Sequence, residues 1–380
     1  MNCKGELRMS SRFSKSTIFM LLVGLLFVSH LYAQGAVFTM TNSRTGNSVL
    51  MFNRAANGRL VQVGTFSTGG LGTGTAIANQ GGIRISPGGR RLFVVNPGSN
   101  DFTVFRITNS GLQFDQRVSS GGQTPVSIAT RGNRVFVANA GGSTGSVDNV
   151  VGFGFNNDGT LTQIAGANSR LSGASTTPTQ IAITPDGSIL IVTEQGTNRI
   201  SVFSINFDGS LNALNSQAFN GLNPSGFAVG TGGRVFVSEL GGNAPNGSTI
   251  SSFGFNSTGS LQQVSNSIPS LQTSGGSLVL MNNGSVGFVG NAGSGTISGF
   301  RIGSDGSISL LNPTGISANV GTGTSPADLA LSNNNAFLFT LNSGTNTIST
   351  FRVDANGTLS PFSTTPTALP AGSFHGLAAQ

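Results

Sequence analysis

Residues 200–211 read ISVFSINFDGSL: an apolar strand that ends at Phe203, six residues to Gly209, and the start of a second strand. The same phrase occurs seven times in the chain, always with six residues from the phenylalanine to the glycine. The pairs are Phe52/Gly58, Phe105/Gly111, Phe153/Gly159, Phe203/Gly209, Phe253/Gly259, Phe300/Gly306 and Phe351/Gly357. Successive phenylalanines are 53, 48, 50, 50, 47 and 51 residues apart. This fixed-period self-similarity indicates a repeat architecture.

Each glycine follows a short polar residue, most often asparagine or aspartate. Such pairs tolerate the positive φ that a tight hairpin demands, so the phenylalanine strand and the next strand form a hairpin. Two more apolar strands precede each phenylalanine strand in most repeats, as in residues 181–183 and 190–193. Four short strands per repeat are typical of a propeller blade.

The first repeat lacks the innermost of these four strands. Residues 376–379 (GLAA), near the end of the chain, match the innermost strand at residues 226–229 (GFAV). We therefore predict an all-β fold, a seven-bladed β-propeller of four-stranded blades, closed by the C-terminal strand completing the first blade. Closure of this kind covers the strand edges that an open ring exposes. A β-helix or a sandwich array does not explain a missing first strand that reappears at the end.

The N-terminal segment Met1–Ala33 has the pattern of a secretory signal. Basic residues such as Lys4 and Arg8 precede an apolar run over residues 18–28, and a small residue, Ala33, follows. We expect cleavage before Gln34, a propeller domain over residues 34–380, and a secreted or periplasmic protein. The alternative is an uncleaved membrane anchor, although the run is shorter than the ~20 residues of a spanning helix.

Charge and composition limit the expected partners. Beyond residue 33 the chain has 15 arginines, no lysine and 11 acidic residues, hence a net charge of +4. No basic run is longer than Arg90-Arg91, and a nucleic-acid surface requires clustered basic residues with stacking aromatics. We expect no nucleic-acid partner, no membrane contact after cleavage, and a monomer. The absence of tryptophan argues against the tryptophan-bearing quinoprotein propellers, and no Cys/His cluster is present for zinc.

The repeats, with phrases such as LFVVN at residues 92–96 and IVTE at 191–194, resemble the lactonase-type seven-bladed propellers. That group includes 6-phosphogluconolactonase-like, carboxymuconate-cyclase-like and YVTN-repeat proteins, and the resemblance covers residues 36–380. It implies a lactonase-type activity, with the cyclase-like members using His, Glu and Arg side chains in the central cleft. The one histidine beyond the signal, His375, does not match the position of the family's catalytic histidine.

One column of the aligned repeats is polar in every blade. The second strand ends at Asn42, Asn96, Asn139, Glu194, Glu239, Asn291 and Asn342. Such side chains can hold the following loop by accepting backbone N–H bonds, which is a structural role. They can also form a ring of binding groups on one face, where Glu194 and Glu239 lie on adjacent blades. Two neighbouring carboxylates can share a cation, or one can act as a general base with a raised pKa.

Two further residues and two loops are candidates on or near that face. Arg84 replaces the small or apolar residue that most blades have in the innermost strand, which favours a side chain in the channel. His375 lies in the closing strand, near the face of the polar column. The loops over residues 140–149 and 240–248 are about five residues longer than their counterparts, and long loops on one face often form a binding rim.

Two functions fit this pattern. The first is an exported binding module that takes a small molecule, a glycan or a protein on its loop face. The alternative is a lactonase-like hydrolase or cyclising enzyme, with Glu194 or Glu239 as base and Arg84 or His375 stabilising an oxyanion. Neither requires a cofactor, although a cation at the channel mouth is compatible with both.

Overall fold

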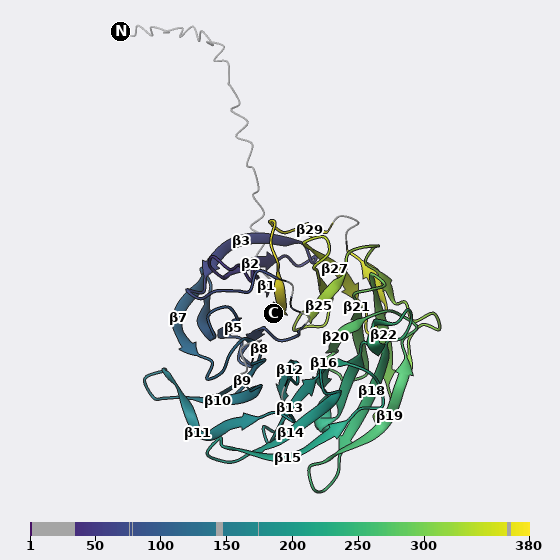
Figure 1. The fold of residues 1–380 in the computed structure, drawn as a ribbon. Coiled ribbons are helices and arrows are strands. Elements are labelled where there is room, and N and C mark those ends of the chain that lie inside the picture. Colours follow the sequence, from purple (N-terminus) through teal and green to yellow (C-terminus); the bar gives the residue numbers. More distant parts are fainter. Residues whose placement is uncertain (2–34, 76, 78, 142–146, 174, 363–365) are drawn as a thin grey trace. The chain divides into compact units, whose positions relative to one another are not determined.

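The computed structural model describes Met1 and residues 35–75, 77, 79–141, 147–173, 175–362 and 366–380. Apart from Met1, the predicted signal lies outside these residues. The described residues form seven antiparallel sheets arranged as blades around a central axis (Figure 1). In each blade the strands follow one another from the axis outward. The structure therefore confirms the predicted seven-bladed β-propeller.

The blades have the following strands. Blade 1 contains β1 (Gly35–Met40), β2 (Ser48–Arg54), β3 (Leu60–Ser67) and β30 (His375–Ala379). Blade 2 contains β4 (Ile83–Ile85), β5 (Arg91–Asn96), β6 (Asp101–Thr108) and β7 (Gly111–Ser119). Blade 3 contains β8 (Pro125–Arg131), β9 (Arg134–Asn139), β10 (Asn149–Phe155) and β11 (Leu161–Arg170). Blade 4 contains β12 (Pro178–Ile183), β13 (Ile189–Glu194), β14 (Arg199–Ile205) and β15 (Leu211–Ala218).

The remaining blades follow the same plan. Blade 5 contains β16 (Pro224–Val229), β17 (Val235–Glu239), β18 (Thr249–Phe255) and β19 (Leu261–Pro269), with two short 3₁₀ turns, η1 (Thr231–Gly233) and η2 (Gly241–Asn243). Blade 6 contains β20 (Gly275–Leu280), β21 (Val286–Asn291), β22 (Thr296–Ile302), β23 (Ile308–Leu310) and β24 (Ala318–Asn319). Blade 7 contains β25 (Pro326–Leu331), β26 (Phe337–Asn342), β27 (Thr347–Val353), β28 (Leu359–Pro361) and β29 (Thr367–Ala368).

The outermost strand is interrupted in blades 6 and 7, where the repeat pattern predicts one continuous strand. In blade 6, β23 and β24 both pair with β22 but are separated by residues 311–317. Pro313 lies in this gap and has no N–H to donate to a ladder, which explains the break. In blade 7, β28 and β29 pair with β27 in the same way.

The hydrophobic core lies between neighbouring blades. The second and third strands bury nearly all of their residues, whereas in an outer strand such as β3 only the first residue is buried. The seven repeat phenylalanines are all at most 3 % exposed. They pack across blade boundaries, as where the ring centroids of Phe102 and Phe153 are 5.2 Å apart. The phenylalanine that defines the repeat is therefore the residue that joins adjacent sheets.

The hairpins after the phenylalanine strands have the predicted turn. Each of the seven repeat glycines has a positive φ, between 77° and 126°. The preceding Asp208 shows why the pair recurs, because its side chain accepts the backbone N–H of Ser210 at 2.9 Å. The polar side chain closes the turn while glycine supplies the left-handed backbone.

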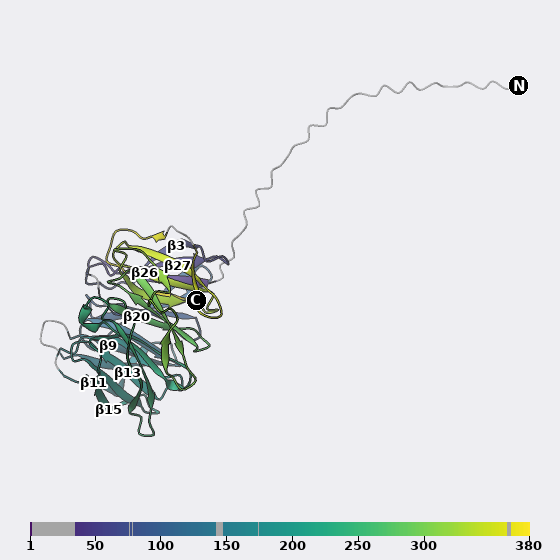
Figure 2. The same ribbon diagram turned by 90° about the vertical axis from the view of Figure 1, so that its right-hand side faces the viewer.

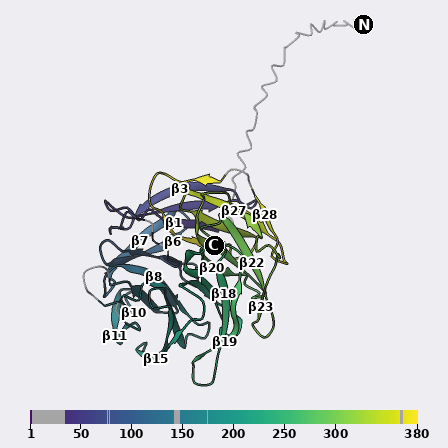
Figure 3. The ribbon, with the colours of Figure 1, turned by 45° about the vertical axis from the view of Figure 1, so that its right-hand side comes forward.

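The C-terminal strand closes the ring as predicted. Strand β30 pairs antiparallel with β1, with Thr39 opposite Leu377 and Val37 opposite Ala379. Figures 1, 2 and 3 show the yellow end of the chain beside the purple first strands of the propeller. The innermost strand of blade 1 thus comes from the other end of the chain, and no edge of β1 is left unpaired. Within the described residues, no helix has the length and apolarity needed to cross a membrane.

Candidate functional site

The polar column at the end of the second strands is buried. All seven of its side chains, at positions 42, 96, 139, 194, 239, 291 and 342, are 0 % exposed. Asn291 donates to the hydroxyls of Thr296 and Ser298, and Asn342 donates in the same way to Thr347 and Ser349. Each side chain ties the end of its strand to the start of the next one. These contacts are structural, although the two asparagines donate to hydroxyls rather than accept the backbone N–H bonds that we expected.

The remaining asparagines of the column make equivalent contacts. Asn96 donates to Asp101 and Thr103, and Asn139 donates to Asn149. Asn42 instead reaches the loop after β3, where it donates to the carbonyl of Thr75 at 2.7 Å. A binding role for the asparagine ring stays a prediction, since none of these side chains faces solvent.

Glu194 and Glu239 are held separately, each by hydroxyls. The Glu194 carboxylate accepts bonds from Ser172, Thr197 and Ser201. The Glu239 carboxylate accepts bonds from Thr249 and Ser251. Burial raises the pKa of Glu239, and the hydroxyl donors oppose that rise.

His375 is buried at the start of β30. Burial lowers its pKa to about 4, so the imidazole is neutral at pH 7. Its Nε2 lies against the backbone of Gly82, where a Cβ would come within 2.6 Å. In this position His375 packs against the start of the innermost strand of blade 2.

Side chains near the axis join the innermost strands of neighbouring blades. The Gln180 amide is bidentate: Phe227 N–H donates to Oε1 at 2.6 Å, and Nε2 donates to the Phe227 carbonyl at 2.8 Å. In the equivalent position Ser127 accepts the N–H of Ile181. Asp328 accepts the N–H of Leu377 at 2.8 Å. Each contact links one blade to the next.

Gln80 makes the corresponding contact for blade 5, whose innermost strand has no side chain at this position. At the equivalent position of blade 5 the chain has Gly226. Gln80, which precedes β4, makes the bidentate contact with Leu278 instead, at 2.9 and 3.0 Å. A Cβ on Gly226 would lie 2.4 Å from Gln80 Oε1. Because blades 2 and 6 are far apart in the ring, Gln80 crosses the axis.

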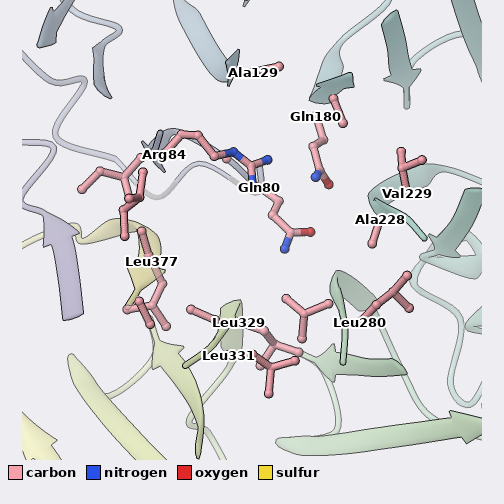
Figure 4. A pocket seen from close by; sticks show the side chains of 18 of the residues that line it. Gln80, Arg84, Ala129, Gln180, Ala228, Val229, Leu280, Leu329, Leu331 and Leu377 are labelled. Carbon is pink, nitrogen blue, oxygen red and sulfur yellow. The ribbon is translucent and has the colours of Figure 1, made fainter. Parts of the chain in front are cut away.

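Two cavities lie along the axis, and Gln80 lines both. The lower cavity, of about 500 Å³, lies where the innermost strands end. It is lined by apolar residues such as Leu280, Leu329 and Leu331, and by Arg84, Gln80 and Gln180 (Figure 4). Figure 4 shows the side chains of Arg84, Gln80 and Gln180 directed toward the centre of this ring.

Arg84 is the one charged side chain among the described residues that line the lower cavity. Its counterparts in the other innermost strands are alanine or valine, at positions 129, 182, 228, 279, 330 and 378. These small side chains leave open the space in front of the guanidinium. Nε donates to the Ile128 carbonyl at a long 3.4 Å, and no described carboxylate lies within ion-pair distance. Burial lowers the pKa of Arg84, while the charge of Asp328 opposes this shift.

Asp328 is the carboxylate that interacts electrostatically with Arg84. It is 2 % exposed, and its two oxygens accept the N–H groups of Leu329 and Leu377, each at 2.8 Å. Burial raises its pKa to about 7, against the opposing effect of these bonds and of Arg84. Strand β25 packs on β30, which packs on β4. A buried carboxyl whose pKa is shifted toward neutrality and whose charge acts on a cavity-lining arginine is a candidate for a functional site.

The upper cavity, of about 400 Å³, lies where the innermost strands begin, on the face of the polar column. The longer loop of blade 5 contributes Leu240 and Asn243 to its wall. Of the other long loop, residues 142–146 lie outside the described part of the chain. Most of its wall comes from blades 5, 6 and 7, and the rest comes from the segments before β4 and β30, with Asn79, Gln80 and Phe374.

The structure does not bring the predicted catalytic residues together. Arg84 lines the lower cavity, at the opposite end of the innermost strands from the polar column. Glu194, Glu239 and His375 line neither cavity. The described residues contain no group of three His, Cys, Asp or Glu side chains that could hold a metal ion. A catalytic role for the two glutamates and the histidine stays a prediction.

Sequence reasoning missed Gln80, Gln180 and Asp328. A signal for two of them is present in the repeat. Gln180 and Asp328 directly precede the apolar residue of their innermost strands, where other blades have glycine or serine. Gln80 has no such signal, because it acts in place of a side chain that is missing from a blade nearly 150 residues later.

A sequence model of one protein family matches most of the chain. The family is described as "Lactonase, 7-bladed beta-propeller", and the matches span residues 38–148, 144–274 and 249–370. No curated protein matches the chain significantly by sequence.

Solved structures share the fold at low identity. A putative 6-phosphogluconolactonase from Bacteroides fragilis has 18% identity and a TM-score of 0.71, over 92% of this chain and 99% of its own. The periplasmic gluconolactonase of Pseudomonas aeruginosa has 19% identity and a TM-score of 0.69, over 90% of this chain and 99% of its own. Virginiamycin B lyase from Staphylococcus aureus has 15% identity and a TM-score of 0.52, over 78% of this chain and 86% of its own. At these identities the likeness concerns the fold alone.

Proposed function

The chain belongs to the lactonase family of seven-bladed β-propellers, and we propose that it is a lactonase-like hydrolase acting on a small anionic lactone in the lower cavity. One observation carries this choice of site: Arg84 is the one charged side chain among the described residues that line a cavity of about 500 Å³. A volume of this size suits a small molecule.

Arg84 supplies the recognition of an anion. Arg84 is half-buried and makes one long hydrogen bond to a carbonyl, so most of its donors remain for a ligand. A partly desolvated cation without a close counter-ion is costly, and an anionic ligand offsets this cost through charge-assisted hydrogen bonds. The alanines around the axis give the ligand access to the guanidinium.

The reaction is the addition of water to the lactone. The water oxygen attacks the carbonyl carbon, the acyl–oxygen bond of the ring breaks, the ring oxygen takes a proton, and a hydroxy acid leaves. The Arg84 guanidinium stabilises the oxyanion that forms during the attack. No carboxylate or imidazole is among the described residues that line the cavity, so the site contributes electrostatic stabilisation and orientation. This favours lactones, which hydroxide opens readily, over amides.

The test is turnover of a lactone panel, followed by acid release at constant pH. The panel pairs phosphorylated or carboxylated lactones with neutral ones. We expect Arg84→Met to lower kcat/KM for anionic lactones at least 100-fold, about 3 kcal/mol of transition-state stabilisation. The matched control is Arg301→Met, at an exposed position of β22. Equal turnover in the wild type and Arg84→Met would reject the assignment.

A second candidate is a binding module that uses the same cavity without turnover. The absence of a described side-chain base in the cavity favours it. Saturable binding of a hydroxy acid such as gluconate, lost in Arg84→Met, together with no turnover of any lactone, would support this function over hydrolysis.

We also propose that the protein is exported. The signal pattern of residues 1–33 supports this, as does the fold shared with a neighbour named as a periplasmic gluconolactonase. N-terminal sequencing of the protein recovered outside the cytoplasm should begin near Gln34. An intact Met1 on the mature protein would contradict the proposal.

A further inference from the structure

The upper cavity differs in chemistry from the lower one. It has about 400 Å³ and begins on the other side of Gln80, between the starts of β16, β20 and β25 and the loops that follow β17, β21 and β26. Gln80 is held in place across the axis by its two bonds to Leu278. The two spaces therefore present separate surfaces to solutes.

Neutral hydrogen-bonding groups form the smaller part of the wall of the upper cavity, and the larger part is apolar. Amides and hydroxyls come from five different segments, at Asn79, Ser225, Asn243, Ser274 and Ser343. None of the described residues that line it is charged. An ion entering this cavity would lose hydration without gaining a counter-charge, whereas an uncharged hydroxyl finds both donors and acceptors.

Apolar groups form the rest of the wall. Phe374, Leu240 and Pro326 line the cavity from separate segments of the chain. A wall that combines an aromatic ring with scattered amides and hydroxyls suits a ligand whose faces are C–H and whose edges are O–H. Polar groups then fix orientation while the apolar wall excludes water.

One hydroxyl of the wall lacks a partner. Ser277 lines the cavity and is 2 % exposed, and its Oγ makes no hydrogen bond to the described residues. A buried hydroxyl without a partner costs free energy, and such groups in native structures call for an explanation. Because this oxygen is itself covered by protein, a ligand hydroxyl in the cavity would satisfy it only after the Ser277 side chain rotates toward the cavity.

We propose that the upper cavity binds an uncharged polyhydroxylated molecule of the size of a monosaccharide. Asn243 is the contact that we test: it is an exposed residue of the wall, and its carbonyl oxygen accepts the Ser274 hydroxyl at 2.8 Å, which joins the loops of blades 5 and 6 there. Its amide N–H donors remain for a sugar hydroxyl. The site does not involve Arg84 and does not depend on hydrolysis in the lower cavity.

The experiment uses the full chain with D-glucose, D-galactose, D-mannose and sorbitol, titrated to tens of millimolar and followed by ligand-detected NMR and calorimetry. Two variants probe the cavity. Asn243→Gly removes the amide from a residue whose φ of 59° glycine accepts, and Ala327→Leu fills space at the wall. Asn246→Gly is the matched control, because Asn246 has a φ of 56° in the same loop and does not line the cavity.

We expect saturable binding of at least one of these sugars, weakened tenfold or more by Asn243→Gly and by Ala327→Leu. Asn246→Gly and Arg84→Met should bind as the wild type does. Thermal melts of the four variants identify any that fail to fold, and either cavity variant that folds suffices. Absence of binding by all four probes would overturn the proposal. So would binding that both cavity variants retain, or binding that only Arg84→Met abolishes, which would place the sugar in the lower cavity.

Discussion

Replacing Asp328 with asparagine should change how the stability of the protein depends on pH. In the folded protein burial raises the pKa of Asp328 from 3.8 to about 7. The unfolded chain ionises near the ordinary value, so between pH 4 and 7 the folded state holds a proton that the unfolded state has lost. The contribution of Asp328 to the free energy of unfolding is therefore fully present at acid pH. It is lost as pH rises from 4 to 7. The shift corresponds to about 4 kcal/mol.

In Asp328→Asn the side chain at position 328 cannot ionise, but it accepts fewer hydrogen bonds. Asp328 accepts the N–H groups of Leu329 and Leu377, and asparagine can accept only one of them with its oxygen. Losing one acceptor in a buried site costs about 1–3 kcal/mol at every pH. The variant should thus be less stable than the wild type at pH 4.5. It should be more stable, by about 1–3 kcal/mol, above pH 7.5.

The assay is urea unfolding of both proteins at half-unit steps from pH 4 to 8. The quantity to plot is the difference between their free energies of unfolding. His375 titrates in the same window with the opposite sign: its lowered pKa of about 4 gives stability that is lost as pH falls from 6.5. Taking the difference removes this contribution because both proteins retain His375. A difference that stays constant within about 1 kcal/mol from pH 4.5 to 7.5 would refute a buried, near-neutral Asp328.

Four further outcomes are expected. Gluconate binding in the lower cavity should weaken as pH rises from 6 to 8, because ionised Asp328 offsets the charge of Arg84; calorimetry should show this dependence vanish in Asp328→Asn. Gln80→Ala should lower the free energy of unfolding by about 2–4 kcal/mol, since two buried backbone groups of Leu278 lose partners, whereas the exposed Gln62→Ala should change it by less than about 0.5. Glu194→Gln and Glu239→Gln should keep lactone turnover within twofold of the wild type, because neither carboxylate lines a cavity. Loss of turnover in either variant would instead support the predicted role of that glutamate as base. Deleting residues 371–380 should abolish cooperative unfolding by circular dichroism, because it removes β30, exposes the edge of β1 and deletes the buried Phe374 and Leu377.

The sequence alone predicted the architecture because the fold is repetitive. The phenylalanine strand, the glycine turn and the apolar strands recur at nearly constant spacing. Each blade therefore gives independent evidence for the same local structure. Even the composite first blade was predictable, since residues 376–379 match the strand that the first repeat lacks. The polar column was also predictable as a set, because all seven side chains occupy one position of the repeat. Local periodicity carries all of this information.

The candidate site depended on contacts between blades, which periodicity does not encode. Sequence comparison singled out Arg84 as the exception among small residues, but only the structure placed it at the opposite end of the axis from Glu194 and Glu239. Asp328 and Arg84 are nearly 250 residues apart, and their coupling arises because β30 lies between their strands. Gln80 occupies the space of the side chain that Gly226 lacks. Gln80 precedes blade 2 and Gly226 belongs to blade 5, so the two meet only across the axis. The repeat determined the features that all seven blades share. Closure of the ring decided which of the residues that depart from the repeat lie close together.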